Sequence, residues 1–210
     1  KYNISEICDR VALAVPHYER DLEEVKQLSH TSDYPFAILG KHEKIHPVVN
    51  AFFSVGCSTG SLDSTLRNGA KYLATELRLK EANVEQRDIN EIQFYNVLVM
   101  FMEAGYPLSN SVRAIADFAE QPLYDALQLI RENIRQEDKL YKSLIKYPEL
   151  FSLSEVQKIK EIEMIPRKSE ADMYERLILQ LRSIVTVLVG EKTNSPSYQE
   201  ALKIINQKDD

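Results

Sequence analysis

The chain of 210 residues is long enough to bury a core and corresponds to one domain or two small ones. Its hydrophobic content of 44% and charged content of 28% are typical of a folded globular protein and argue against a disordered chain. The formal net charge of −6 argues against nucleic acid or an anionic membrane as its main partner.

Membrane spans and disulfides are not expected either. The longest stretch free of Asp, Glu, Lys and Arg, residues 45–62, carries His, Asn, Ser and Thr and is too polar to cross a bilayer. Cys8 and Cys57 form no C-x-x-C pair, which suits a reducing compartment. We therefore expect a cytoplasmic protein with no membrane span in this chain and no signal peptide.

Helical periodicity governs the first part of the chain. Amphipathic segments at 4–15 and 18–28 are followed by a turn and by a short helix near 36–39. Pro47 then begins a strongly apolar helix, PVVNAFFSVGC, because proline is well suited to the first helical position.

An elbow at Gly56–Gly60 is expected to end this helix, and Ser61 to cap the next one. Apolar positions of that long helix recur at spacings of three and four and predict a buried stripe: Leu62, Leu66, Ala70, Leu73 and Leu77. The apolar periodicity of this helix ends in the polar stretch KEANVEQRD, where we place a domain boundary.

A second series of helices follows this boundary. The first, over 88–104, ends at Gly105, which supplies a left-handed cap, and Pro107 cannot continue it. Ser109 or Asn110 would cap the second. The remaining helices are expected over 112–120, 123–139, 140–145, 155–164, 170–189 and 195–207.

The two halves share the order of a helix, an elbow and a long helix, which indicates an internal repeat. We therefore predict an all-α fold of two related antiparallel bundles of about six helices each, residues 1–86 and 87–210. The repeat aligns Leu66 with Leu177 and predicts that both are buried. An aromatic stripe should form the bundle core rather than a ligand pocket: Phe52, Phe53, Phe94, Tyr95, Phe101 and Met102.

The letters HEKIH at His42, Glu43 and His46 match the zinc-protease pattern H-E-x-x-H. Pro47 argues against that function, because it disfavours the helical conformation at His46 that the two ligands require. No third ligand stands out downstream, and no phosphate loop or nucleophile elbow is present. We expect no metal, no cofactor and no enzymatic activity, and a zinc metalloprotease is the disfavoured alternative.

Two motifs carry a resemblance to a known family. Ala104, Gly105, Pro107 and Leu108 follow the apolar helix that contains VLVMFME, and a second motif combines Gly56, Gly60, Leu62 and Leu66. In order and spacing these residues resemble the cytoplasmic domains of type II secretion system F proteins and type IV pilus inner-membrane platform proteins. The resemblance covers residues 46–190, and in the first half mainly 46–80.

The resemblance implies a non-enzymatic scaffold that contacts the assembly ATPase and other proteins of the machine, at the inner-membrane face of a bacterial cell. It also allows self-association into a homo-oligomer. Two departures are clear: Cys57 stands where the family has a glutamate, and the connector at 80–90 joins the halves where platform proteins have membrane helices. A helical regulatory adaptor that shares the fold is therefore the alternative function.

Four acidic residues near the second elbow are the candidate partner-binding site. Glu161, Glu163, Glu170 and Asp172 fall within twelve residues, in a segment that lacks the glycines of the first elbow. Such a patch would attract a basic protein surface.

Overall fold

The computed structural model of the chain describes residues 4–14, 19–28, 47–136, 139–166 and 169–193, which form helices and turns without a strand. The all-α prediction is thereby confirmed. None of the helices in this part of the chain is long and apolar enough to cross a membrane. In chain order they are α1 (Ile4–Ala14), α2 (Glu19–Leu28), α3 (Val48–Thr59), α4 (Leu62–Glu81), α5 (Gln86–Glu103), α6 (Leu108–Ala116), α7 (Leu123–Arg135), α8 (Leu140–Leu144), α9 (Leu153–Met164) and α10 (Glu170–Thr193).

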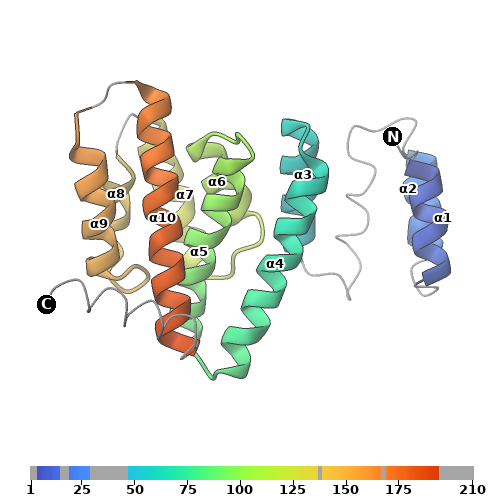
Figure 1. Ribbon diagram of the computed structural model, residues 1–210, viewed down its shortest axis with the longest axis horizontal. Helices are drawn as coiled ribbons and strands as arrows, with labels where there is room; N and C mark the ends of the chain where they lie inside the picture. Colours follow the sequence, from blue (N-terminus) through green and yellow to red (C-terminus); the bar gives the residue numbers. More distant parts are fainter. Residues whose placement is uncertain (1–3, 15–18, 29–46, 137–138, 167–168, 194–210) are drawn as a thin grey trace, which may run out of the picture.

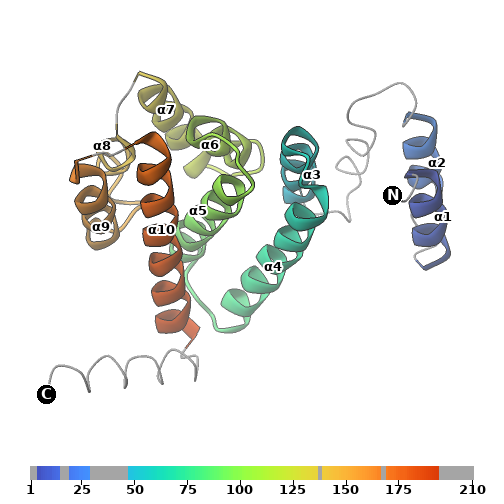
Figure 2. The ribbon, with the colours of Figure 1, turned by 45° about the horizontal axis from the view of Figure 1, so that its top comes forward.

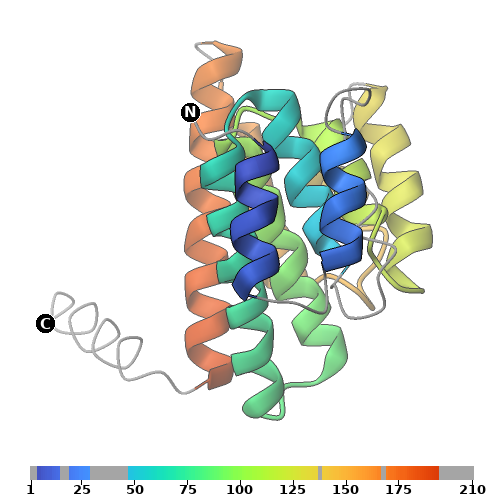
Figure 3. The same cartoon turned by 90° about the vertical axis from the view of Figure 1, so that its right-hand side faces the viewer.

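Helix α5 lies at the centre of the molecule (Figure 1). Helices α4, α6 and α10 all pack against it, and α4 and α10 run antiparallel to it (Figures 1 and 3). Its residues from Ile89 to Met102 are buried almost without exception, and between Phe94 and Met102 all but Asn96 are apolar.

Five residues of the predicted aromatic stripe belong to the core, and the sixth, Phe53, is also buried but lines the cavity between α3 and α6. The rings of Phe52 and Phe101 meet edge to face with centroids 4.9 Å apart, and those of Phe94 and Phe151 with centroids 5.0 Å apart. Phe52 belongs to α3 and Phe101 to α5, so the core continues across the boundary expected between residues 86 and 87.

Contacts between the two halves are extensive. Helix α3 packs on α6, and α4 packs on both α5 and α10. The described part of the second half contains six helices, α5 to α10, and that of the first half contains four. The arrangement into two related bundles, divided between residues 86 and 87, stays a prediction.

Helices α1 and α2 form a hairpin that lies beyond α3 at one end of the molecule (Figure 1). Leu22 and Val25 are buried, and Lys26 Nζ lies 2.8 Å from Asp9 Oδ1 across the hairpin. The two N-terminal helices are thus present as expected. The short helix near 36–39 and the last helix over 195–207 fall outside the described residues.

Two glycines end helices as predicted, whereas the elbow begins later than expected, because Gly56 is still helical. Gly60 and Gly105 end α3 and α5 with φ angles of +68° and +82°, which glycine adopts without strain. Gly56 lies inside α3 rather than in the elbow, where a Cβ atom would be 2.1 Å from Thr65 Oγ1. Glycine is therefore required at this position for α3 and α4 to approach closely.

The prediction that Leu66 and Leu177 are equivalent buried positions is wrong. Leu177 is 0% exposed, but the Leu66 side chain is 39% exposed. Helix α4 faces α3 through Thr65 and Gly69 instead, and a Cβ atom at Gly69 would be only 3.2 Å from the Phe52 ring. Small side chains thus set the rotation of α4, and its leucine stripe lies about a quarter-turn away from the core.

The expected serine and asparagine caps are also wrong. Ser61 precedes α4, but its side chain makes no capping hydrogen bond to the helix backbone. Helix α6 already begins at Leu108, because Pro107 has extended backbone angles and turns the chain directly into the helix. Ser109 and Asn110 are therefore residues of the first helical turn.

Candidate functional site

The acidic residues near the second elbow do not form one open patch. Glu163 is only 4% exposed, and its carboxylate points inward. Its two oxygens accept hydrogen bonds from the backbone N–H groups of Leu140, at 3.0 Å, and Tyr141, at 2.8 Å. Glu163 therefore caps the first turn of α8, and its prediction as a surface partner-binding residue is wrong.

The other three acids differ from one another. Glu161 is exposed and accepts a hydrogen bond from Gln157, one turn earlier on α9. Asp172 is half-buried and pairs with Arg176 at 2.8 Å on the same helix. Glu170 is the first residue of α10, and its side chain lies outside the described part. Only Glu161 is seen to be exposed, so the remaining candidates do not define a site.

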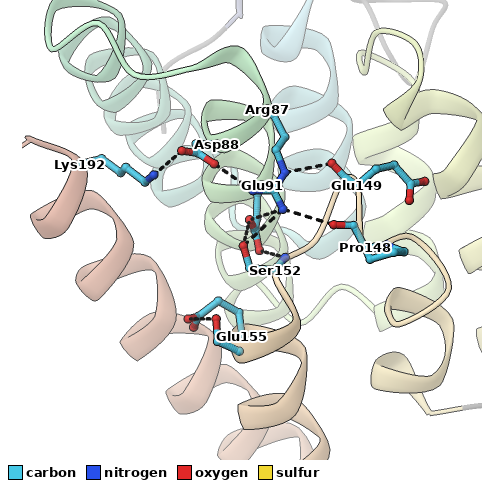
Figure 4. A network of polar contacts seen from close by, with 9 residues as sticks. Arg87, Asp88, Glu91, Pro148, Glu149, Ser152, Glu155 and Lys192 are labelled. Carbon is cyan, nitrogen blue, oxygen red and sulfur yellow. Dashed lines mark hydrogen bonds and ion pairs between the residues drawn. The ribbon is translucent and has the colours of Figure 1, made fainter.

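A second buried carboxylate, Glu91, lies in the polar network shown in Figure 4. It is 2% exposed and belongs to the central helix α5. Ser152, the residue before α9, donates both its backbone N–H and its hydroxyl to Glu91, each at 2.7 Å. The carboxylate therefore fixes the start of α9 against α5.

Arg87 lies one turn before Glu91 and extends this network. Its guanidinium lies 3.9 Å from Glu91 and donates to the backbone carbonyls of Glu149, at 2.9 Å, and Pro148, at 3.4 Å (Figure 4). Asp88 forms ion pairs with Arg87 and with Lys192 at the end of α10. These contacts join α5, α10 and the turn before α9.

Burial has clear electrostatic effects in this network. It raises the pKa of Glu91, although the hydrogen bonds from Ser152 and the charge of Arg87 oppose the rise. Burial, reinforced by the nearby charge of Glu91, also holds the pKa of Tyr95 well above its usual value. The neighbouring Glu155 is buried as well and pairs with Lys158 at 3.0 Å.

The sequence contained a signal for Glu91 and Glu163, two of the three buried carboxylates among the described residues. Glu91 is followed at helical spacing by Phe94, Tyr95 and Leu98, so it lies on an apolar face. Glu163 is four residues beyond the buried Ile159 and lies on the same side of α9. An acid in line with buried apolar positions indicates a carboxylate that accepts hydrogen bonds inside the protein.

A cavity of about 680 Å³ lies between α3 and α6. Its walls carry the aromatic side chains of Phe53, Tyr106 and Phe118, together with polar groups that include Asn50 and Arg113. This mixture of aromatic and polar groups is suited to binding a ligand.

Metal chemistry has no support from the described residues. Within them, no cluster of three or more His, Cys, Asp or Glu side chains could hold a metal ion. His42, Glu43 and His46 lie outside this part of the chain, so the absence of zinc there stays a prediction. Cys57 is exposed rather than buried, and partial desolvation raises the pKa of its thiol, which disfavours the reactive thiolate.

Comparison with family models, with curated proteins and with solved structures finds no match to this chain. The resemblance to platform proteins therefore rests on the two sequence motifs alone.

Proposed function

We propose that the chain is a non-enzymatic helical scaffold of a type IV pilus or type II secretion assembly platform, where it contacts the assembly ATPase. The observation that carries the proposal is the use of the motif residues in the fold. Gly105 ends α5 in the left-handed conformation, Pro107 turns the chain, and Leu108 begins α6 with its side chain buried. The apolar helix, turn and second helix thus follow the order on which the resemblance is based.

The buried polar groups support a scaffold role. Glu91 accepts the backbone N–H at the start of α9, and Glu163 accepts two at the start of α8, so these hydrogen bonds hold the helices in place. Such contacts fix the relative positions of α5, α8 and α9 and suit a body that transmits force between partners. Mechanistically, we infer that the scaffold couples the ATPase to pilin movement through helix faces.

A helical regulatory adaptor is the second candidate. One observation favours it: residues 82–85 alone join α4 to α5, where platform proteins have membrane helices between their domains. The Val84 N–H donates to the Leu79 carbonyl at 3.1 Å, so this connector is a tight, ordered turn. An adaptor would use the same helix faces for a different partner.

The test is a pull-down with purified proteins. The chain is immobilised and offered the assembly ATPase encoded in the same genome, with an unrelated hexameric ATPase as the control. We expect capture of the assembly ATPase only. If neither this ATPase nor another component of the machine is captured, the adaptor function is favoured instead.

A further inference from the structure

Helix α4 exposes an apolar face of its own. Leu66 is 39% exposed and Leu77 is 57% exposed, and Ala70 and Ala74 between them are exposed as well. Their spacing of four, four and three residues places them on one side of the helix. We call these four residues the α4 face.

The α4 face is exposed because α4 uses another side to join the protein. Thr65 and Gly69 face α3, and Tyr72 and Leu79 are buried in the core. Helix α3 has 12 residues and α4 has 20, so α3 runs beside only part of α4, and the C-terminal part of α4 extends past it (Figure 2). Among the described helices, none substantially covers the α4 face.

A basic edge runs along one side of this face. It consists of Arg67, Lys71 and Arg78, all of them exposed. Arg67 pairs with Asp63 at 3.0 Å, whereas Lys71 and Arg78 make no ion pair with other described residues. Two positive charges are therefore free to meet negative charges from outside.

We propose that the α4 face is a docking surface for an amphipathic helix of a partner protein whose apolar stripe is bordered by Asp or Glu. The inference deepens the scaffold function proposed above and rests on it. Ala70 and Ala74 allow the backbone of a second helix to approach closely, while Leu66 and Leu77 contact its apolar side chains at either end. Its acidic edge would meet Lys71 and Arg78.

Charge distinguishes this occupant from two others. In a pair of antiparallel α4 helices from two copies of the chain, the basic edges would meet and repel each other. An anionic membrane would attract the basic edge, but the chain as a whole has a formal net charge of −6. An amphipathic helix with an acidic edge can contact the leucines through its apolar side chains and pair its carboxylates with the basic edge.

The experiment measures binding of a labelled synthetic peptide to the full chain by fluorescence anisotropy. The peptide is an amphipathic helix with a leucine stripe and glutamates along one edge; the comparison peptide has lysines in place of the glutamates. We expect the glutamate peptide to bind more tightly than the lysine peptide, and added salt to reduce the difference.

Variants of the chain locate the site. Leu66→Ser combined with Leu77→Ser should weaken binding of the glutamate peptide about tenfold or more. The matched control is Leu129→Ser combined with Leu179→Ser, which replaces two other exposed leucines, on α7 and α10, and should leave binding unchanged. Circular dichroism checks that every variant keeps its helix content.

Several results would overturn the proposal: no binding of the glutamate peptide, equal binding of both peptides, or equal loss in both leucine variants. Self-association that disappears in the Leu66→Ser, Leu77→Ser variant would assign the face to a second copy of the chain. Binding to vesicles of anionic phospholipid, lost in that variant, would assign it to a membrane. Capture of the assembly ATPase is a separate measurement, so the scaffold function and this docking surface can fail independently.

Discussion

Replacing Glu163 by alanine should destabilise the protein strongly, although an acid next to a loop would ordinarily be regarded as a surface residue. The carboxylate accepts the N–H groups of Leu140 and Tyr141 at 3.0 and 2.8 Å, and the residue before α8, Lys139, provides no side-chain cap. Glu163→Ala would therefore remove the only side-chain acceptors seen at the start of this five-residue helix among the described residues.

The magnitude follows from the two hydrogen bonds. Each bond to a charged acceptor contributes about 1.5 to 3 kcal/mol. Leu140 is fully buried, so its N–H would be left without water, but Tyr141 is half-buried and water could partly replace the acceptor. We therefore expect a loss of about 2 to 4 kcal/mol in the free energy of unfolding.

Urea unfolding followed by circular dichroism measures this loss as a lower midpoint with an unchanged slope. Glu161→Ala on the same helix is the matched control and should stay within about 0.5 kcal/mol of the wild type, because Glu161 is exposed. Glu163→Gln should be intermediate, since its amide oxygen accepts one N–H while its NH₂ group faces the other. A Glu163→Ala variant as stable as the Glu161→Ala control would refute the capping role.

Three further predictions concern the core. Burial raises the pKa of Glu91, so the protonated carboxyl group stabilises the fold below the ordinary glutamate pKa of about 4.3, and this contribution is lost as the pH rises through the raised pKa. Glu91→Gln should therefore flatten this part of the plot of unfolding free energy against pH. Leu177→Ala should cost about 2 to 5 kcal/mol and Leu66→Ala far less in urea unfolding; equal losses would contradict the observed rotation of α4. Gly56→Ala should lower the melting temperature despite the better helix propensity of alanine, because its methyl group would clash with Thr65; a stabilised variant would show that α3 and α4 can separate at little cost.

The sequence predicted the ends of α3 and α5 well because these ends depend on local chemistry. Gly60 and Gly105 adopt left-handed angles that other residues avoid, and Pro107 cannot continue a helix, so both turns could be read from single residues. The burial of the aromatic residues of α5 was predicted equally well, because Phe94, Tyr95, Phe101 and Met102 lie in a segment that is apolar except for Asn96.

The orientation of α4 could not be read in the same way. Periodicity favoured the leucine stripe as the buried side because leucine gains more from burial than glycine or threonine. In the structure, close approach of α3 decides instead: Gly56 leaves room for Thr65, and Gly69 leaves room for the Phe52 ring. To predict the contact between α3 and α4, one would have to know that the small residues of these two helices face each other. A single sequence does not show which helices will meet.

The same limit explains the misassigned acids. Glu161 and Glu163 are two residues apart and look alike in a list of charges, but they lie on different sides of α9. Glu163 lies one turn after the buried Ile159 on the same side of α9, and only this position distinguishes it from the exposed Glu161. A count of charges within a segment therefore predicts one acidic patch, whereas the helix places these acids on different sides.

Exposed leucines alone do not mark a binding surface, because single apolar side chains are common on the outside of proteins. Leu129 and Leu179 are as exposed as Leu77, but each lies on a separate helix. The α4 face differs in that its two leucines lie on one side of one helix, with small residues between them and two free positive charges alongside. A surface with both features fits one kind of partner, an apolar helix with an acidic edge, and for this reason we assign partner binding to α4 and not to the other exposed leucines.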